Sequence, residues 1–115
     1  MWDGFNLRKF PRLPLRCRLT VYPGRSISKY STTTKNLSLG GVCCILSKPF
    51  ARMKVCKVKV KLQSNSKPIE GVGRISWSVP TQQSARGKKV YDVGIEFIDF
   101  PPEGIERIRR FLVKK

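Results

Sequence analysis

The sequence predicts a mainly β protein, a small six-stranded antiparallel barrel followed by one C-terminal helix. Short runs in which apolar and polar residues alternate recur along the chain, separated by turns rich in glycine, proline and serine, as is typical of half-buried strands. After the last run, apolar residues recur at helical spacing almost to the end of the chain. The 115 residues suffice for one domain with a modest core.

The first three strands are expected in the first half of the chain. Residues 13–21 alternate between apolar and polar side chains, and Pro23 with the following glycine ends that strand. The polar stretch 26–34 is expected to be a loop that leads into a second strand through Asn36. The short apolar run 42–46 is the third strand.

Three further strands are expected at 54–62, 71–79 and 91–97. Their alternation fixes which side chains face the core, because successive residues of a strand point to opposite faces. This rule assigns Trp77 to the core face of its strand. Lysines occupy the outward positions of the first of these strands, at 57, 59 and 61.

The helix is expected at about 102–113. Proline is tolerated in a first helical turn and an acid is favourable there, so Pro102 and Glu103 mark its start. Residues 1–7 are expected to form a flexible lead-in, and residues 8–115 a single domain. The apolar residues that recur at helical spacing are Ile105, Ile108, Phe111 and Leu112.

The chain is strongly basic, with a formal net charge of +17. Residues 1–67 hold fifteen Lys and Arg against one acid, so the positive charge is concentrated in the first half. Such a field attracts polyanions of several kinds. It therefore identifies no partner by itself.

The sequence offers little for catalysis or metal binding. It contains no histidine, the usual general base near neutral pH, and no nucleophile or nucleotide-binding fingerprint. Its four cysteines lack the spacing of a metal site. We therefore expect a non-enzyme without metal or cofactor, whose cysteines are small core residues in a reducing compartment.

The sequence also bears on location. No apolar run approaches the about 20 residues that span a bilayer, and the N-terminus has no signal-peptide pattern. We expect a cytoplasmic protein, or a domain of a larger one, that does not span a membrane.

Two short motifs point to a ligand. In Asn36-x-Ser38-x-x-Gly41, small polar side chains stand beside bare backbone and can form a shallow floor for a planar, polar molecule. Upstream, Arg8 and Arg12 form an Arg-x-x-x-Arg segment just before the first strand. Each motif alone is unspecific, because such residues are common in turns and on surfaces.

Together and in this order, the two motifs resemble those of the PilZ domain family, bacterial receptors for the dinucleotide second messenger cyclic di-GMP. Segments 37–43, 73–77 and 92–97 are also similar to strands of that family. The resemblance covers roughly residues 8–112 and implies a six-stranded barrel.

The resemblance also implies which residues contact cyclic di-GMP. Arginine suits this ligand, because its planar fork binds phosphate or guanine edges and stacks on purines. Lys9 stands where many relatives have a second arginine, and Asn36 stands where aspartate is common. Arg74 and Trp77 are weaker candidates. The implied ligand contacts are Arg8, Lys9, Arg12, Asn36, Ser38, Gly40 and Gly41.

The implied function is a receptor module whose N-terminal arm changes its order on ligand binding and relays the signal to a protein partner of unknown identity. Such relatives are associated with motility, surface attachment in biofilms and exopolysaccharide production. Two alternatives stay open: a basic barrel that binds nucleic acid, and an interaction module that has lost its ligand. No specific nucleic acid is expected as a partner. The first alternative would use Arg16, Arg18, Lys57, Lys59 and Lys61.

Overall fold

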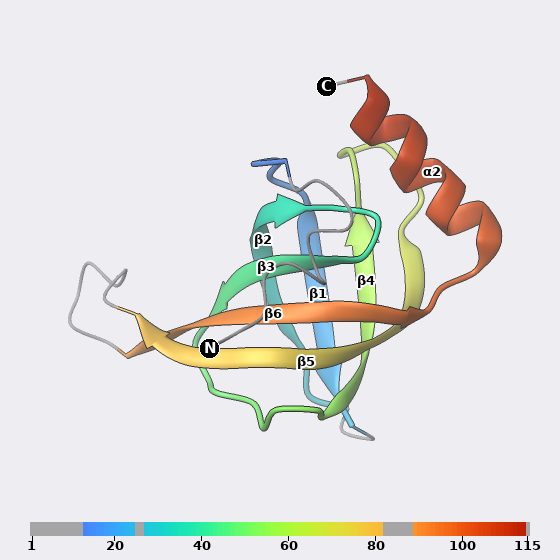
Figure 1. The fold of residues 1–115 in the computed structure, drawn as a ribbon. Helices are drawn as coiled ribbons and strands as arrows, with labels where there is room; N and C mark the ends of the chain where they lie inside the picture. The colour runs from blue at the N-terminus through green and yellow to red at the C-terminus, as the bar shows by residue number, and fades with distance from the viewer. Residues whose placement is uncertain (1–12, 25–26, 82–88, 115) are drawn as a thin grey trace.

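The computed structural model describes residues 13–24, 27–81 and 89–114. Six antiparallel strands close into a barrel in the order β1-β2-β3-β6-β5-β4, and one helix follows them (Figure 1). The predicted fold class is confirmed. The elements are β1 Arg18–Pro23, β2 Tyr30–Leu37, β3 Gly41–Leu46, β4 Val55–Lys61, β5 Ile69–Thr81, β6 Val90–Asp99 and α2 Pro102–Val113.

The core occupies the interior of the barrel and consists of the strand side chains that point inward. In β4 the alternation predicted from the sequence is confirmed, since Val58 and Val60 are fully buried while the lysines that alternate with them face outward. The largest fully buried side chains from other strands and the helix are Leu19, Val21, Leu37, Ile75, Val93 and Ile108.

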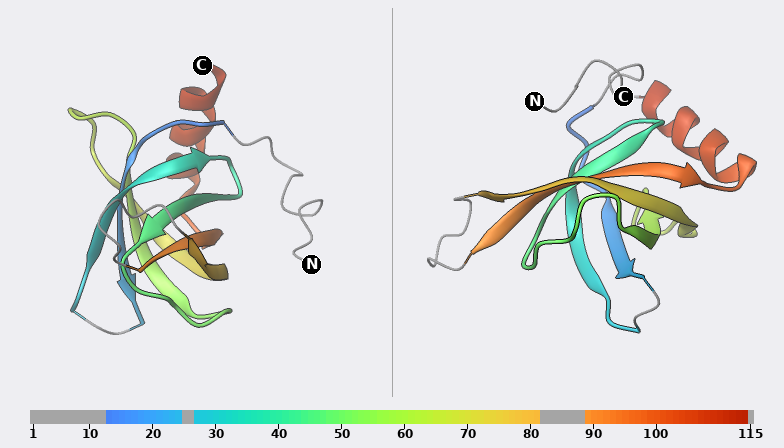
Figure 2. Two further views of the ribbon diagram at one scale, coloured as in Figure 1. Left: turned by 90° about the vertical axis from the view of Figure 1, so that its left-hand side faces the viewer. Right: turned by 60° about the horizontal axis from the view of Figure 1, so that its bottom comes forward.

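Helix α2 covers one end of the barrel (Figure 2). Ile108 is fully buried, and Phe111 and Leu112 pack against the core from the same side of the helix. Its bounds agree with the predicted 102–113. Within the described ranges, no helix combines the length and the apolar character needed to cross a membrane.

Two strands begin several residues away from the positions that the sequence predicted. β1 begins at Arg18 rather than at residue 13, because residues 13–17 are held by separate hydrogen bonds to β2. β2 begins at Tyr30, inside the stretch predicted as a loop. Its polar first half pairs with β1 from Arg18 to Val21, and this pairing outweighs its polar composition.

The prediction that Trp77 belongs to the core is wrong. A β-bulge lies between Ile75, which pairs with Ile95, and Trp77, which pairs with Gly94. The extra residue, Ser76, shifts the alternation by one position, so Trp77 changes face. Ile95 is buried and Gly94 lies on the opposite, outer side of β6, so Trp77 stands outside the barrel.

Candidate functional site

Ser38 closes the turn between β2 and β3. Its N–H donates to the carbonyl of Gly41 at 2.9 Å, and its Oγ accepts from the N–H groups of Gly40 and Gly41 at 3.0 and 3.2 Å. The side chain is buried, with 2% relative exposure. The hydroxyl of Ser38 therefore stabilises the turn from inside. Because the side chain is buried, the outer surface of the turn consists mainly of backbone atoms.

Gly40 and Gly41 allow this turn to pack closely against β6. The N–H of Phe97 donates to the carbonyl of Gly40 at 2.9 Å, and Gly41 pairs with Glu96. A Cβ at Gly41 would collide with the carbonyl oxygen of Ile95, so the position has no room for any side chain. The predicted floor of small residues is thus present at the outer side of the β3–β6 pair.

Trp77 adds an aromatic wall to this floor. Its indole ring lies directly over Gly94, where a Cβ would overlap the six-membered ring. The hollow between the turn and the ring has a volume of only about 20 Å³, so a ligand of nucleotide size would lie over it rather than inside it. The residues that line it are Ser38, Gly40, Gly41, Val42, Ser76, Trp77, Ile95 and Glu96.

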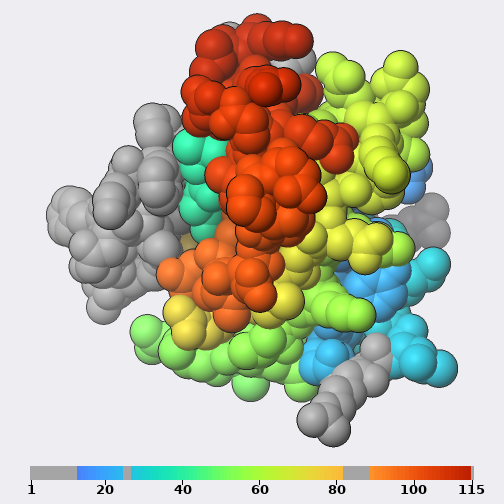
Figure 3. Space-filling model, turned by 90° about the vertical axis from the view of Figure 1, so that its right-hand side faces the viewer, coloured from blue at the N-terminus to red at the C-terminus, as the bar shows by residue number. Residues whose placement is uncertain are grey.

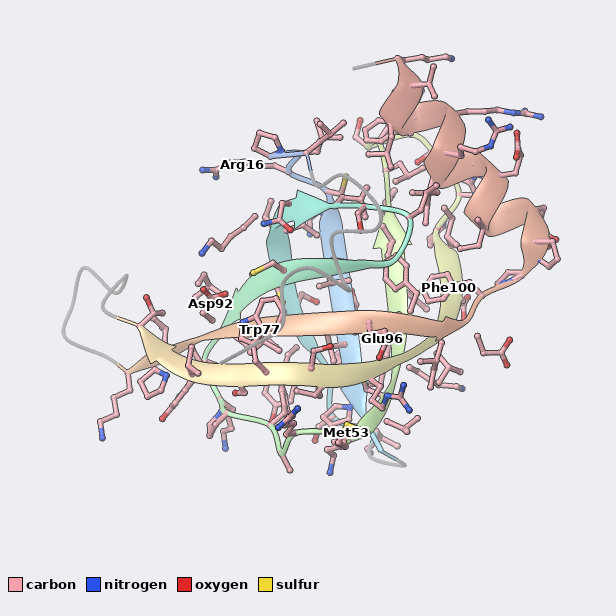
Figure 4. All side chains as sticks on the ribbon, viewed as in Figure 1. Arg16, Met53, Trp77, Asp92, Glu96 and Phe100 are labelled. Atoms are coloured by element: carbon pink, nitrogen blue, oxygen red, sulfur yellow. The ribbon has the colours of Figure 1, made fainter. Side chains whose placement is uncertain are left out.

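Two acidic side chains flank the hollow along β6, and each is paired with a cation. Figure 4 shows Asp92, Trp77 and Glu96 along the same outer side of β5 and β6. Glu96 is 3.1 Å from Arg74, and Asp92 is 3.3 Å from Lys35. These pairs compensate the two carboxylates, which would otherwise repel an anionic ligand. Because all four side chains are partly exposed, each pair adds at most about 1 kcal/mol to stability.

Two cysteines lie next to each other near the site. Cys43 donates to Asp92 across the β3–β6 pair, with 3.0 Å between sulfur and Oδ1. Cys44 faces the core, where burial raises the pKa of its thiol well above the ordinary value and the nearby Cys43 and Asp92 raise it further. No group of three potential metal-ligating side chains occurs among the described residues.

The chain enters the barrel beside the Asn36–Gly41 turn. Leu13 and Leu37 exchange two backbone hydrogen bonds of 3.0 Å. Deeper in, the Thr34 hydroxyl donates to the carbonyl of Leu15 at 2.6 Å and accepts from the N–H of Cys17 at 2.8 Å. These bonds fasten residues 13–17 along β2.

The predicted ligand contacts Arg8, Lys9 and Arg12 lie outside the described residues. Leu13 follows Arg12 directly in the chain, and its partner Leu37 stands between Asn36 and Ser38. The described chain therefore begins, at Leu13, next to the Asn36-x-Ser38-x-x-Gly41 motif.

Asn36 has a side-chain oxygen whose surroundings bear on ligand binding. Its Oδ1 is buried, and no hydrogen-bond partner for it exists in the part of the chain that the structure describes. A buried acceptor without a donor costs about 1–3 kcal/mol, so it favours any molecule that supplies an N–H at this point.

Of the predicted contacts that the structure describes, Ser38, Gly40 and Gly41 line the hollow, whereas Asn36 pairs with Cys43 and is not part of its lining. Sequence reasoning placed Trp77 on the wrong face of its strand. The one signal for its true position was Gly94 on β6, because a large ring can lie over a residue without a side chain. It also passed over Thr34, which lies in the stretch predicted as a loop and fastens the entering segment.

Comparisons with known proteins agree with this architecture. The model of the PilZ domain family matches residues 6–114. No curated protein sequence matches the chain. One similar solved structure is the Bacillus subtilis inhibitor of motility MotI/DgrA, with 14% identity, a TM-score of 0.75, and coverage of 93% of this chain and 50% of that one.

Two further solved structures share the fold. MrkH, described as a c-di-GMP-dependent transcription regulatory factor, shows 17% identity, a TM-score of 0.74, and coverage of 93% of this chain and 50% of its own. The PilZ domain of YcgR from Escherichia coli, solved with c-di-GMP, shows 12% identity, a TM-score of 0.67, and coverage of 93% and 89%. The chain spans about half the length of the first two proteins. The match of the family model over almost all of its length shows that this chain belongs to the PilZ domain family.

Proposed function

We propose that this chain is a receptor module for cyclic di-GMP and acts by binding rather than by catalysis. The observation that carries the proposal is the pairing of Leu13 with Leu37, which ends the described part of the arginine-bearing segment beside the Asn36–Gly41 turn. Membership of the PilZ family and the c-di-GMP complex of the YcgR domain support the same ligand.

The site suits the parts of this ligand. A guanine ring can stack on the indole of Trp77, which is partly exposed and lines the hollow. The buried Oδ1 of Asn36 can accept a hydrogen bond from a guanine N–H or from the backbone of the arm. The turn built by Ser38, Gly40 and Gly41 allows the ligand to approach the backbone closely.

The cations of the arm supply the phosphate contacts in this proposal. Arg12 is one residue from Leu13, and Arg8 is five residues away, so the arm can extend at most about 18 Å from the turn. Both guanidinium groups can bind phosphate oxygens or guanine edges bidentately, and Lys9 adds a point charge. Ligand binding would change the order of this arm and so alter how the domain meets a protein partner.

The output of the receptor is part of the proposal. Control of motility is one candidate, because the B. subtilis neighbour is named as an inhibitor of motility. Biofilm formation and exopolysaccharide production are others, and a cytoplasmic location would suit each of them.

Isothermal titration calorimetry with cyclic di-GMP tests the proposal. We expect saturable binding, no comparable binding of GMP or GTP, and loss of binding in Arg12→Ala. Lys48→Ala is the matched control, because Lys48 is an exposed cation in the loop after β3 and lies off the site. Absence of heat from the wild-type protein at high concentration, or equal losses in the two variants, would reject the proposed function.

A further inference from the structure

A row of cations covers the outer surface of β1 and β4, and we call it the β1–β4 basic face. The strand order places the β1–β4 pair across the barrel from the β3–β6 pair that carries the candidate site. Figure 1 shows the same relationship, with β1 and β4 behind β3 and β6. The basic face consists of Arg16, Arg18, Lys57, Lys59 and Lys61.

The register of the two strands fixes the spacing of these charges. Arg18 lies opposite Lys61, and the three lysines of β4 recur at every second residue, about 6.7 Å apart. The residues between them are buried in the core, so the lysines cannot turn inward without exposing it. In Figure 3 atoms of β1 (blue) and of the β4 region (yellow-green) both reach the surface of the molecule.

Few acids lie near these charges within the described part of the chain. Neither β1 nor β4 contains an acid, and none of the ion pairs found among the described residues involves a member of the basic face. The one acid in register beside it is Glu70, opposite Lys59. Like charges opposite each other across strands are destabilising, so the barrel carries a repulsion that a bound polyanion would relieve.

Two hollows adjoin the row of lysines. One, of about 390 Å³, is lined by Tyr22, Lys57, Val58, Lys59, Glu70, Gly71 and Val72. The other, of about 500 Å³, is lined by Arg16, Arg18, Lys61 and the polar turn after β4. The Lys59 ammonium lies over the ring of Tyr22, 5.7 Å from its centroid, so the first hollow combines a cation with an aromatic ring.

We propose that the β1–β4 basic face binds single-stranded nucleic acid through its phosphate backbone, without sequence preference. Regular cations beside an aromatic ring are the combination that such strands require, and a flexible strand can place a base in each hollow. An acidic protein fits less well, because the centres of protein interfaces are depleted in lysine. A flat anionic membrane would contact the lysine row and leave the hollows unfilled. This inference does not depend on the proposed cyclic di-GMP site.

Fluorescence anisotropy with a labelled oligothymidylate at several salt concentrations tests this inference. If all five cations contact phosphates, the logarithm of the association constant falls with the logarithm of salt concentration with a slope of up to about −3.5. Lys57→Gln/Lys59→Gln/Lys61→Gln should reduce the magnitude of the slope by about 2. Tyr22→Leu should weaken binding about fivefold or more if a base stacks on the ring.

A triple variant with the same loss of charge separates this face from the general effect of a basic protein. Lys48→Gln/Lys89→Gln/Lys114→Gln changes three exposed lysines outside the basic face and should keep the wild-type slope. Circular dichroism confirms that both triple variants are folded. The inference is overturned if the two triple variants weaken binding equally, if the oligonucleotide does not bind at low salt, or if only phosphatidylserine vesicles bind. Cyclic di-GMP titration of the first triple variant should match wild type, so failure of either proposal can be told from failure of the other.

Discussion

Leu13 and Leu37 form an isolated antiparallel bridge in which each N–H donates to the other's carbonyl at 3.0 Å. This bridge links the segment that enters the barrel to the middle of the Asn-x-Ser motif, since Leu37 stands between Asn36 and Ser38. Leu13 directly follows the Arg8–Arg12 motif, and Leu37 lies inside the Asn36–Gly41 motif. The backbone pairing of these two leucines therefore joins the ends of two motifs that are more than twenty residues apart in the sequence. A ligand that binds both would act directly on the entry point of the chain.

Trp77→Leu should weaken binding of cyclic di-GMP by about fivefold to a hundredfold, because one base loses its stacking surface. Calorimetric titration measures the change. Tyr22→Leu is the matched control, since it removes a half-buried ring from the opposite side of the barrel. Equal affinity of Trp77→Leu and wild type would show that the indole does not contact the ligand.

Gly41→Ala should lower the free energy of unfolding by about 2 kcal/mol or more, because the new methyl group would collide with the backbone carbonyl of Ile95. Gly71→Ala should cost less, since its methyl group meets the ring of a side chain, Phe100, rather than a backbone carbonyl that is fixed by strand pairing. Urea unfolding compares the two variants through their midpoints. A smaller loss in Gly41→Ala than in Gly71→Ala would contradict this reading of the β3–β6 pair.

Thr34→Val should lower the free energy of unfolding by about 2 kcal/mol, because it leaves the carbonyl of Leu15 and the N–H of Cys17 without the hydroxyl that satisfies them. The exposed neighbour Thr33 provides a control, and Thr33→Val should stay within about 0.5 kcal/mol of wild type. Hydrogen exchange of the Cys17 amide reports the local effect. Unchanged protection there in Thr34→Val would show that the hydroxyl does not fasten the entering segment.

Stability should fall as the pH rises above about 9. Burial raises the pKa of the Cys56 thiol from 9.0 to about 11, and it raises that of Cys44 further. In this range the unfolded chain loses thiol protons that the folded chain keeps. The free energy of unfolding therefore decreases by about 1.4 kcal/mol per pH unit for each thiol, whereas below pH 9 their contribution is fully present.

Urea unfolding of wild type and Cys56→Ala between pH 8 and 11 isolates the thiol from the lysines and tyrosines that titrate nearby. The variant should be less stable at pH 8, because it loses buried volume, and its stability should depend less steeply on pH above 9. Parallel curves for the two proteins would rule out a contribution from this thiol.

Elements with a strong local pattern could be predicted from the sequence. The strict alternation around Val58 and the helical spacing around Ile108 place each side chain on its observed face. Both patterns depend on neighbouring residues alone. The order of the arginine pair and Asn-x-Ser-x-x-Gly likewise indicated the family, which the match over residues 6–114 confirms.

Features that depend on pairing between distant segments could not be predicted in this way. The polar stretch from Tyr30 becomes a strand because β1 supplies its hydrogen-bonding partners. The bulge at Ser76 arises where β5 meets β6, and it alone moves Trp77 from the core to the outer face.

The sequence by itself determined the barrel, the helix and the two motifs, because repeating patterns of polarity and turn residues are encoded over a few neighbouring positions. Only the tertiary structure decided that the Asn36–Gly41 turn, the entry at Leu13 and the ring of Trp77 lie together. The physical reason is register. A single extra residue in one strand reverses the face of every side chain that follows, and the partner strand determines where that residue is accommodated.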